Sequence, residues 1–247
     1  MSNEIRPGGF SILPTVVKNL LIINGLFYLA TMAFERYGLD LRTLLGLYIP
    51  QSEHFRPHQL ITYIFMHGDF QHILFNMFAL WMFGSAIENY WGGKRFLIYY
   101  MLTGLGAGLI HMAVQEVQFF NIISEISAAE FEDIKANGRE VLQMHKNYSD
   151  PLLGKLNGLL NVYTVGASGS VFGLLLAFGM MFPNSRIYLY FFFPIKAKYF
   201  VIGYGLIELF SGISNRPGDN VAHFAHLGGM LFGFILIKLW QKRGSRF

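Results

Sequence analysis

Three short polar patches interrupt long apolar stretches of this chain, and their residue types could carry out acyl transfer. The first patch holds Ser168 between two glycines, the second holds His226, and the third holds His72 and Asn76. A serine hydroxyl becomes a nucleophile when a base such as histidine lies within hydrogen-bond reach and can take its proton. The patches therefore predict a serine nucleophile, provided that the fold brings them together.

The residues around these side chains fit the other needs of this chemistry. Gly166 and Gly169 leave room for another backbone to approach Ser168 closely. If Ser168 begins a helix, free backbone N–H groups and the positive end of the helix dipole lie beside it, as an oxyanion site requires. His72 and Asn76 are four residues apart, so on a helix they share one face and could both donate to an oxyanion.

Each patch also has a structural interpretation. Small residues such as those around Ser168 are ordinary packing material between membrane helices. Three pairs of glycines have the G-x-x-x-G spacing of close helix contacts: Gly104/Gly108, Gly169/Gly173 and Gly229/Gly233. A histidine inside an apolar segment is costly and is a functional candidate by default. His72 and His226 therefore favour the functional interpretation.

The composition is that of a membrane protein. Of the 247 residues, 53% are hydrophobic and 14% are charged, against about 25% charged residues in a soluble domain. The absence of cysteine excludes disulfides, thiolate catalysis and cysteine-based zinc sites. The net charge is +4, but no long basic run is present, so a nucleic-acid partner is not expected. No H-E-x-x-H motif occurs, and no metal or cofactor is expected.

Apolar stretches near the roughly 20 residues of a bilayer crossing predict an all-α polytopic fold with six transmembrane helices. The spans are Pro14–Phe34, Ile73–Tyr90, Phe96–Gln115, Ser168–Phe182, Lys198–Ile213 and Val221–Trp240. The first is expected to be a retained helix, because no clear signal-peptidase site follows it. Ile187–Ile195 is too short to span and is interpreted as an interfacial or re-entrant turn broken by Pro194.

Lys and Arg are concentrated in one set of connecting segments, which predicts that both termini face the cytoplasm in the cell membrane. Spans two, four and six then run from outside to inside, and each begins with one polar patch. The patches should meet near the outer face. Residues 1–247 are expected to form one membrane domain. Within it, residues 116–161 are a polar outer insertion with an amphipathic helix interrupted at Gly138, whose role stays open.

With these motifs in order, the chain closely resembles the rhomboid protease family, in its bacterial form with a six-helix core. The motifs are Gly166-Ala167-Ser168-Gly169 for G-x-S-G, His72-Ile73-Leu74-Phe75-Asn76 for H-x-x-x-N, and Ala225-His226-Leu227-Gly228-Gly229-Met230-Leu231-Phe232-Gly233 for A-H-x-x-G-x-x-x-G. Glu88–Gly92 and Phe193–Tyr199 also look like the family. The resemblance covers nearly the whole chain.

The resemblance implies an intramembrane serine endopeptidase with a Ser–His dyad, without the carboxylate that orients histidine in a soluble triad. Ser168 would be the nucleophile and His226 the general base. His223 competes for the second role on sequence alone, but the motif places it as a polar neighbour nearer the surface. The Ser168 backbone N–H, His72 and Asn76 would hold the oxyanion. The implied substrates are single-pass transmembrane proteins with a small residue at the cut, met within the lipid bilayer.

Other positions and interpretations stay open. Phe172, four residues after Ser168, would pack against the catalytic histidine. His58-Gln59 stands where many relatives have a Trp-Arg pair, which leaves the anchoring of the first outer loop undecided. Glu208 could tune access to the site or be a hydrogen-bonded or water-exposed group. A catalytically inactive binding or trafficking protein is one alternative; a transporter that uses His72, His226 and Glu208 is another.

Overall fold

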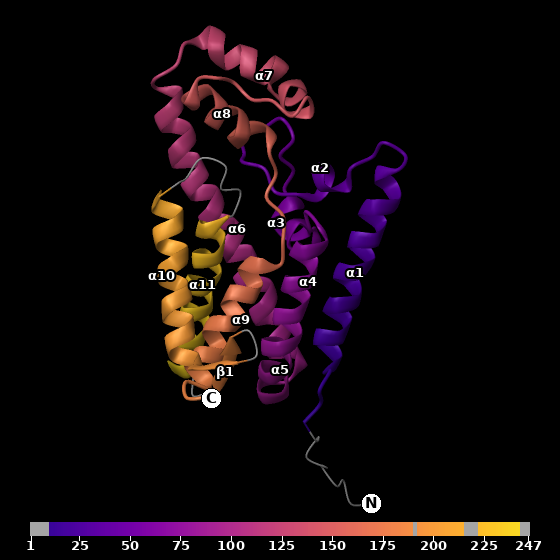
Figure 1. The fold of residues 1–247 in the computed structure, drawn as a ribbon, viewed down its shortest axis with the longest axis vertical. Coiled ribbons are helices and arrows are strands. Elements are labelled where there is room, and N and C mark those ends of the chain that lie inside the picture. Colours follow the sequence, from indigo (N-terminus) through magenta and orange to yellow (C-terminus); the bar gives the residue numbers. More distant parts are fainter. Residues whose placement is uncertain (1–9, 190–191, 215–221, 243–247) are drawn as a thin grey trace, which may run out of the picture.

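The computed structural model describes residues 10–189, 192–214 and 222–242, which form a helical bundle with one short hairpin (Figure 1). Among them, four helical segments are long and apolar enough to cross a membrane. These are α1 (Thr15–Glu35), the continuous rod of α4 (Phe70–Ala79), η2 (Leu80–Gly84) and α5 (Ser85–Trp91), then α6 (Gly93–Ile123) and α11 (His223–Lys242). Long apolar helices thus occur at the predicted first, second, third and sixth spans.

The predicted fourth and fifth spans correspond to α9 (Ser168–Met181) and α10 (Ala197–Ser214). The 14 residues of α9 extend about 21 Å at 1.5 Å per residue, less than the roughly 30 Å hydrocarbon core of a bilayer. Most of α9 is buried, because α6, α10 and α11 pack around it. Figure 1 shows α9 beginning part-way along α6. Its N-terminus therefore lies within the bundle rather than at its end.

Two predicted boundaries differ from the structure or fall outside it. α6 ends at Ile123 rather than at Gln115, so it extends into the segment predicted as a polar insertion. The predicted start of the last span, Val221, lies outside the described residues, as do the terminal residues used to predict orientation. The short elements of the outer region are α2 (Leu41–Leu45), α3 (Gln59–Thr62), η1 (Tyr63–Phe65), α7 (Ala128–Gln143) and α8 (Pro151–Asn161).

Glycines let three central helices touch through their backbones. A Cβ atom on Gly229 of α11 would collide with the carbonyl group of Gly169 of α9, and a Cβ atom on Gly169 would collide with Ala107 of α6. One turn further along, the hydroxyl of Tyr99 donates to the Gly173 carbonyl at 2.8 Å. The predicted role of these glycine pairs in close helix packing is confirmed.

Glu88 ties the long rod to the beginning of α1. The residue before α1, Pro14, provides no side-chain cap, and the backbone N–H groups of Val16 and Val17 instead donate to the Glu88 carboxylate at 2.9 and 2.7 Å. A carboxylate also complements the positive end of the α1 dipole. At the same end of the bundle, the indole ring of Trp91 packs against that of Trp240 near the end of α11, with ring centroids 5.5 Å apart.

The outer region has its own small core, which includes Ile134 of α7 and Leu156 of α8. A capping box of Ser127 and Glu130 begins α7. The predicted interruption at Gly138 is wrong, because α7 runs through this residue. Gly138 is buried against Asn157 of α8, whose amide donates to the Gly138 carbonyl at 3.0 Å. The glycine therefore permits a close helix contact and does not break the helix.

The predicted turn at residues 187–195 is a hairpin of β1 (Arg186–Leu189) and β2 (Phe193–Lys196). The strands are antiparallel, and Pro194 lies opposite Tyr188 inside β2. The expectation that Pro194 breaks this segment is therefore wrong. In a two-stranded sheet each strand is an edge, so a proline without an N–H group is tolerated there.

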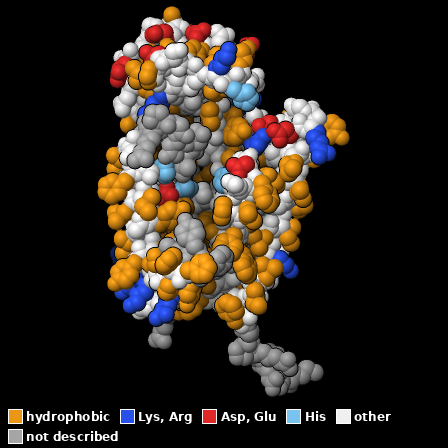
Figure 2. All heavy atoms as spheres, in the orientation of Figure 1, with side chains coloured by type: hydrophobic (Ala, Val, Ile, Leu, Met, Phe, Trp, Pro, Cys, Tyr) orange, Lys and Arg blue, Asp and Glu red, His pale blue; other side chains and the backbone are white. Residues whose placement is uncertain are grey.

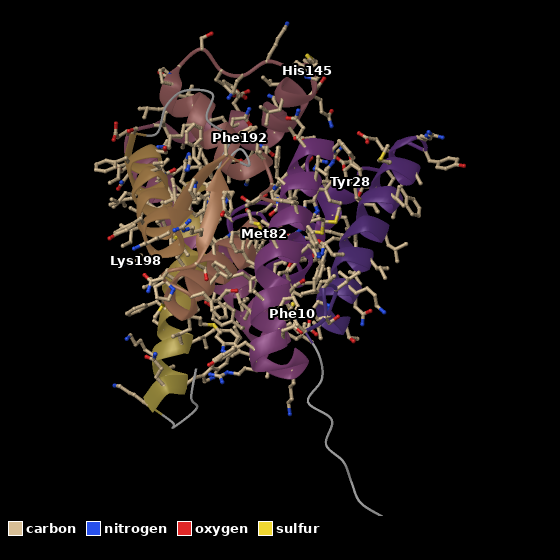
Figure 3. All side chains as sticks on the ribbon, turned by 60° about the horizontal axis from the view of Figure 1, so that its bottom comes forward. Phe10, Tyr28, Met82, His145, Phe192 and Lys198 are labelled. Carbon is tan, nitrogen blue, oxygen red and sulfur yellow. The ribbon has the colours of Figure 1, made fainter. Side chains whose placement is uncertain are left out.

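The surface is apolar around the middle of the bundle and charged at its ends (Figure 2). Leu26, Phe75, Ile207 and Phe210 are each at least 59% exposed. Figure 3 shows side chains projecting outward around the bundle, among them Met82 of η2. A continuous apolar surface of this extent fits a lipid environment and would be a liability in water.

Substitution of Gly138 by alanine should loosen the outer region. The new methyl group would overlap the Asn157 amide, and overpacking of this kind costs about 1–3 kcal/mol. Thermal unfolding in detergent, together with trypsin cleavage within α7, would measure the loss. Gly158→Ala is the matched control, because open space surrounds Gly158 and a helical Gly→Ala change stabilises by roughly 0.4–1 kcal/mol. Equal behaviour of both variants would contradict the assigned contact.

His54 should make the stability of the outer region depend on pH. Its Nε2 atom lies 2.8 Å from the Arg139 guanidinium of α7 and must accept a hydrogen bond, so His54 is neutral there. Partial burial, and secondarily Arg139, lower the pKa of His54 below its usual 6.5. The stabilisation is fully present above the unfolded pKa and is lost as the pH falls through the folded pKa.

We expect the melting temperature of the wild type to fall more than that of His54→Gln between pH 7.5 and pH 5. Glutamine can still accept from Arg139 but does not titrate. The two melting temperatures, measured in one detergent across this range, check the expectation. Parallel pH curves for the two proteins would show that His54 is not responsible.

Candidate active site

The backbone before α9 brings Ser168 to its position. The N–H group of Gly166 donates to the Tyr63 carbonyl at 2.9 Å, and Leu47 pairs with Thr164. Gly166 has a φ of +132°, a conformation that favours glycine. The helix begins at Ser168 and has no side-chain cap. The first N–H groups of α9 are therefore available beside the Ser168 hydroxyl.

His226 lies against Ser168, as the sequence predicts. Its Nε2 atom is 2.9 Å from Ser168 Oγ, although the two residues are 58 positions apart. The imidazole is 8% exposed and stacks on the Phe172 ring, with centroids 4.1 Å apart and an angle of 7°. The packing predicted for Phe172 is thus present. The backbone contact of Gly169 with Gly229 fixes the separation of α9 and α11 next to this pair.

A carboxylate joins the histidine on its other side. Glu208 Oε2 of α10 lies 2.9 Å from His226 Nδ1 and 2.6 Å from His223 Nδ1. Glu208 is 4% exposed. Of the two environments that the sequence left open, hydrogen-bonded or exposed to water, the structure therefore shows the hydrogen-bonded one. The expected dyad included no such carboxylate. Figure 2 shows histidine and acidic atoms together among apolar side chains, at the level below α7 and α8.

The same three residues are the one group among the described residues whose ligand atoms lie close enough for a metal ion. Their separations of 2.6 and 2.9 Å are hydrogen-bond lengths. Ligand atoms around a tetrahedral zinc ion with Zn–N bonds of about 2.0 Å would be about 3.3 Å apart. The arrangement is therefore that of a hydrogen-bonded cluster.

α4 places His72 beside the loop that precedes Ser168. The Asp69 side chain caps α4 by accepting from the His72 N–H group at 2.8 Å. His72 Nδ1 accepts from the Gly68 N–H group at 3.3 Å, which leaves Nε2 as the protonated nitrogen of a neutral ring. A Cβ atom on Gly166 would lie 2.8 Å from that Nε2 atom. The structure thus brings a hydrogen-bond donor to the Gly166–Ser168 backbone.

Asn76 and Ser170 are both held by helix backbones. The Asn76 amide donates to the His72 carbonyl of its own helix at 2.8 Å, with its second N–H group still available. Asn76 is buried, on the helix face of His72. The Ser170 hydroxyl donates to the Tyr100 carbonyl of α6 at 2.8 Å and is buried. Ser170 therefore joins helices, whereas Ser168 faces His226.

Gln59 organises the first outer loop, a role that sequence reasoning did not assign. It is 1% exposed, and its amide donates to the His54 carbonyl at 2.9 Å while its oxygen accepts from the Arg56 N–H group at 3.0 Å. His58 lies 3.1 Å from the Leu44 carbonyl. At the position where many relatives have Trp-Arg, the loop is thus held by a buried amide. In the sequence, only its place two residues after the Arg56-Pro57 pair marks Gln59, and its burial is visible only in the structure.

Comparison with known proteins assigns the chain to a family. The rhomboid domain family matches residues 54–243, so the chain belongs to the rhomboid family. With its apolar helices, it is a multi-pass membrane protein.

The chain is similar to RHOMBOID-like protein 12, mitochondrial, of Arabidopsis thaliana, with 30% identity over 94% of this chain and 60% of that protein. Rhomboid protein 1, mitochondrial, of Saccharomyces cerevisiae shows 24% identity over 76% of this chain and 44% of that protein. Rhomboid protease GluP of Bacillus subtilis shows 40% identity over 23% of this chain and 11% of that protein. The matched part of the chain therefore spans 60% or less of the length of each of these relatives.

Alanine at Gly166 should slow the reaction of Ser168 with a fluorophosphonate probe. The positive φ is strained for alanine, at about 1–3 kcal/mol, and the methyl group would press on His72. At 1.36 kcal/mol per factor of ten, we expect labelling to be roughly tenfold to hundredfold slower. Gly203→Ala on α10 is the control, because nothing lies near that position. Wild-type labelling of Gly166→Ala would show that this loop does not shape the site.

Proposed function

We propose that this chain is an intramembrane serine endopeptidase that cuts transmembrane segments of other membrane proteins. The observation that carries the proposal is the 2.9 Å contact between Ser168 Oγ and His226 Nε2 at the partly buried start of α9. Membership of the rhomboid family supports it. Nucleophile and base at hydrogen-bond distance are the signature of an activated serine.

In the proposed reaction, His226 Nε2 takes the hydroxyl proton while Ser168 Oγ attacks the carbonyl carbon of the scissile peptide bond. The carbonyl oxygen becomes an oxyanion, which accepts hydrogen bonds from the Ser168 N–H group, His72 Nε2–H and the free Asn76 N–H. The C–N bond then breaks, and His226 returns its proton to the leaving amine. A water molecule, deprotonated by His226, hydrolyses the ester and restores Ser168.

The position of the site suggests which substrates fit. Ser168 lies inside the apolar part of the bundle, so the scissile bond must come from a segment within the bilayer. A helix hides its carbonyl groups in hydrogen bonds, so a substrate must unwind near the cut, which glycine, proline or polar residues favour. We infer single-pass substrates with a small residue at the cut.

The proposed placement is a six-span domain of residues 1–247 in the cell membrane, with both termini cytoplasmic. It rests on the distribution of Lys and Arg. The site, α7 and α8 then face outward, and residues 116–161 form the outer insertion. Two of the relatives are named as mitochondrial proteins. Protease protection of tags at the two ends would test the orientation.

Substitution of Ser168 by alanine should abolish cleavage of a reporter-fused single-pass segment in liposomes. The matched control is Ser170→Ala, which removes a serine two positions away that bonds to α6. We expect this control to retain the nucleophile and to lose only about 1 kcal/mol of stability. Product formation on gels, with fluorophosphonate labelling of each protein, measures both effects.

Cleavage by the Ser168→Ala protein at the wild-type rate would refute the assigned nucleophile. An absence of both cleavage and labelling in the folded wild type, over a panel of segments, would favour the alternative of an inactive binding protein on the same fold.

A further inference from the structure

The two histidines of α11 share one carboxylate oxygen. Glu208 Oε2 is within hydrogen-bond distance of Nδ1 of both His223 and His226. The two histidines are three residues apart on one helix, so they lie on one face, and that face is turned to α10. Since all three side chains are largely buried, water cannot easily replace these contacts.

The contact decides which nitrogen of His226 carries the proton. An ionised carboxylate can only accept hydrogen bonds, so both Nδ1 atoms must donate to it. In a neutral imidazole the other nitrogen is then an acceptor. His226 Nε2 therefore presents its lone pair to the Ser168 hydroxyl, which is the form that a general base needs.

The same carboxylate would help after proton transfer. When His226 takes the Ser168 proton, both of its ring nitrogens carry hydrogen and the ring is positively charged. The buried carboxylate on Nδ1 then faces a cation, an interaction that is strong where water is excluded. His223 holds the carboxylate oxygen from the other side, so the position of Glu208 does not depend on His226 alone.

We propose that Glu208 is a positioning residue that converts the Ser168–His226 pair into a triad, and that His223 fixes the Glu208 carboxylate. This inference rests on the proposed function. It differs from a purely structural role, in which Glu208 would only pair with the two buried histidines without affecting the chemical step.

The test is the kinetics of Glu208→Gln on the reporter segment in liposomes. The amide keeps the shape of the side chain, but its NH2 group can donate to Nδ1 and so select the wrong tautomer. We expect kcat to fall by up to roughly 10⁴-fold, the loss seen when the carboxylate of a soluble serine-protease triad is changed to an amide. KM should stay within about threefold, because the interaction acts on the transition state.

Two further variants in this cluster test the proposal even if Glu208→Gln does not fold. Glu208→Asp retains the charge and should recover part of the lost kcat. His223→Gln should lower kcat less than Glu208→Gln. Ile207→Ala, a 59% exposed neighbour on α10, is the control and should match the wild type. In histidine labelled with ¹⁵N, the His226 signal should report a protonated Nδ1 in the wild type and a protonated Nε2 in Glu208→Gln.

Melting temperatures separate slow chemistry from unfolding. If Glu208→Gln is folded, wild-type kcat and an unchanged His226 tautomer would overturn the inference. If it unfolds, Glu208→Asp and His223→Gln decide, and wild-type kcat in both would overturn it. These results leave the proposed function intact as long as cleavage is lost in Ser168→Ala. Equal cleavage by wild type and Ser168→Ala would instead remove the proposed function itself.

Discussion

The rest of the site depends on the backbone contact between α9 and α11. A Cβ atom on Gly229 would overlap the Gly169 carbonyl, and a Cβ atom on Gly169 would overlap Ala107 of α6, so neither glycine can carry a side chain. Ser168 precedes the first glycine by one residue, and His226 precedes the second by three. The distance between nucleophile and base is therefore set by main-chain packing, which is stiffer than any arrangement of long side chains. The packing of α9 against α11 therefore also determines the geometry of the Ser168–His226 pair.

Several polar groups inside the bundle each link two elements. The Tyr63 hydroxyl donates to the Gly104 carbonyl of α6, and Ser170 of α9 donates to Tyr100 of the same helix. Glu88 of α5 accepts from the first turn of α1, and Glu208 of α10 bonds to α11. The apolar face of a helix is about as stable against lipid as against another helix. Hydrogen bonds of this kind and close packing therefore hold the helices in register.

Sequence reasoning reached the main parts of the site because they lie in contiguous motifs. Ser168 and the glycine pairs stand out by their spacing, whereas the choice of His226 over His223 and the packing of Phe172 came from the family resemblance. The partner of Glu208 could not be found in this way, because it depends on how α10 is rotated against α11. Gly138 was misinterpreted for a related reason: a glycine inside a helix indicates a break or a close contact, and only the facing residue, Asn157, decides which.

The π-helical turn η2 accommodates an extra residue in the rod from Phe70 to Trp91. A π turn contains about one residue more than an α turn, which rotates everything after it by about 100°. His72 at one end of the rod meets the loop before Ser168, while Glu88 at the other caps α1. Straightening Leu80–Gly84 into an α-helix with the same number of residues would therefore swing Glu88 away from α1. The rod thus holds about one residue more between these two contacts than a continuous α-helix would, and η2 takes it up.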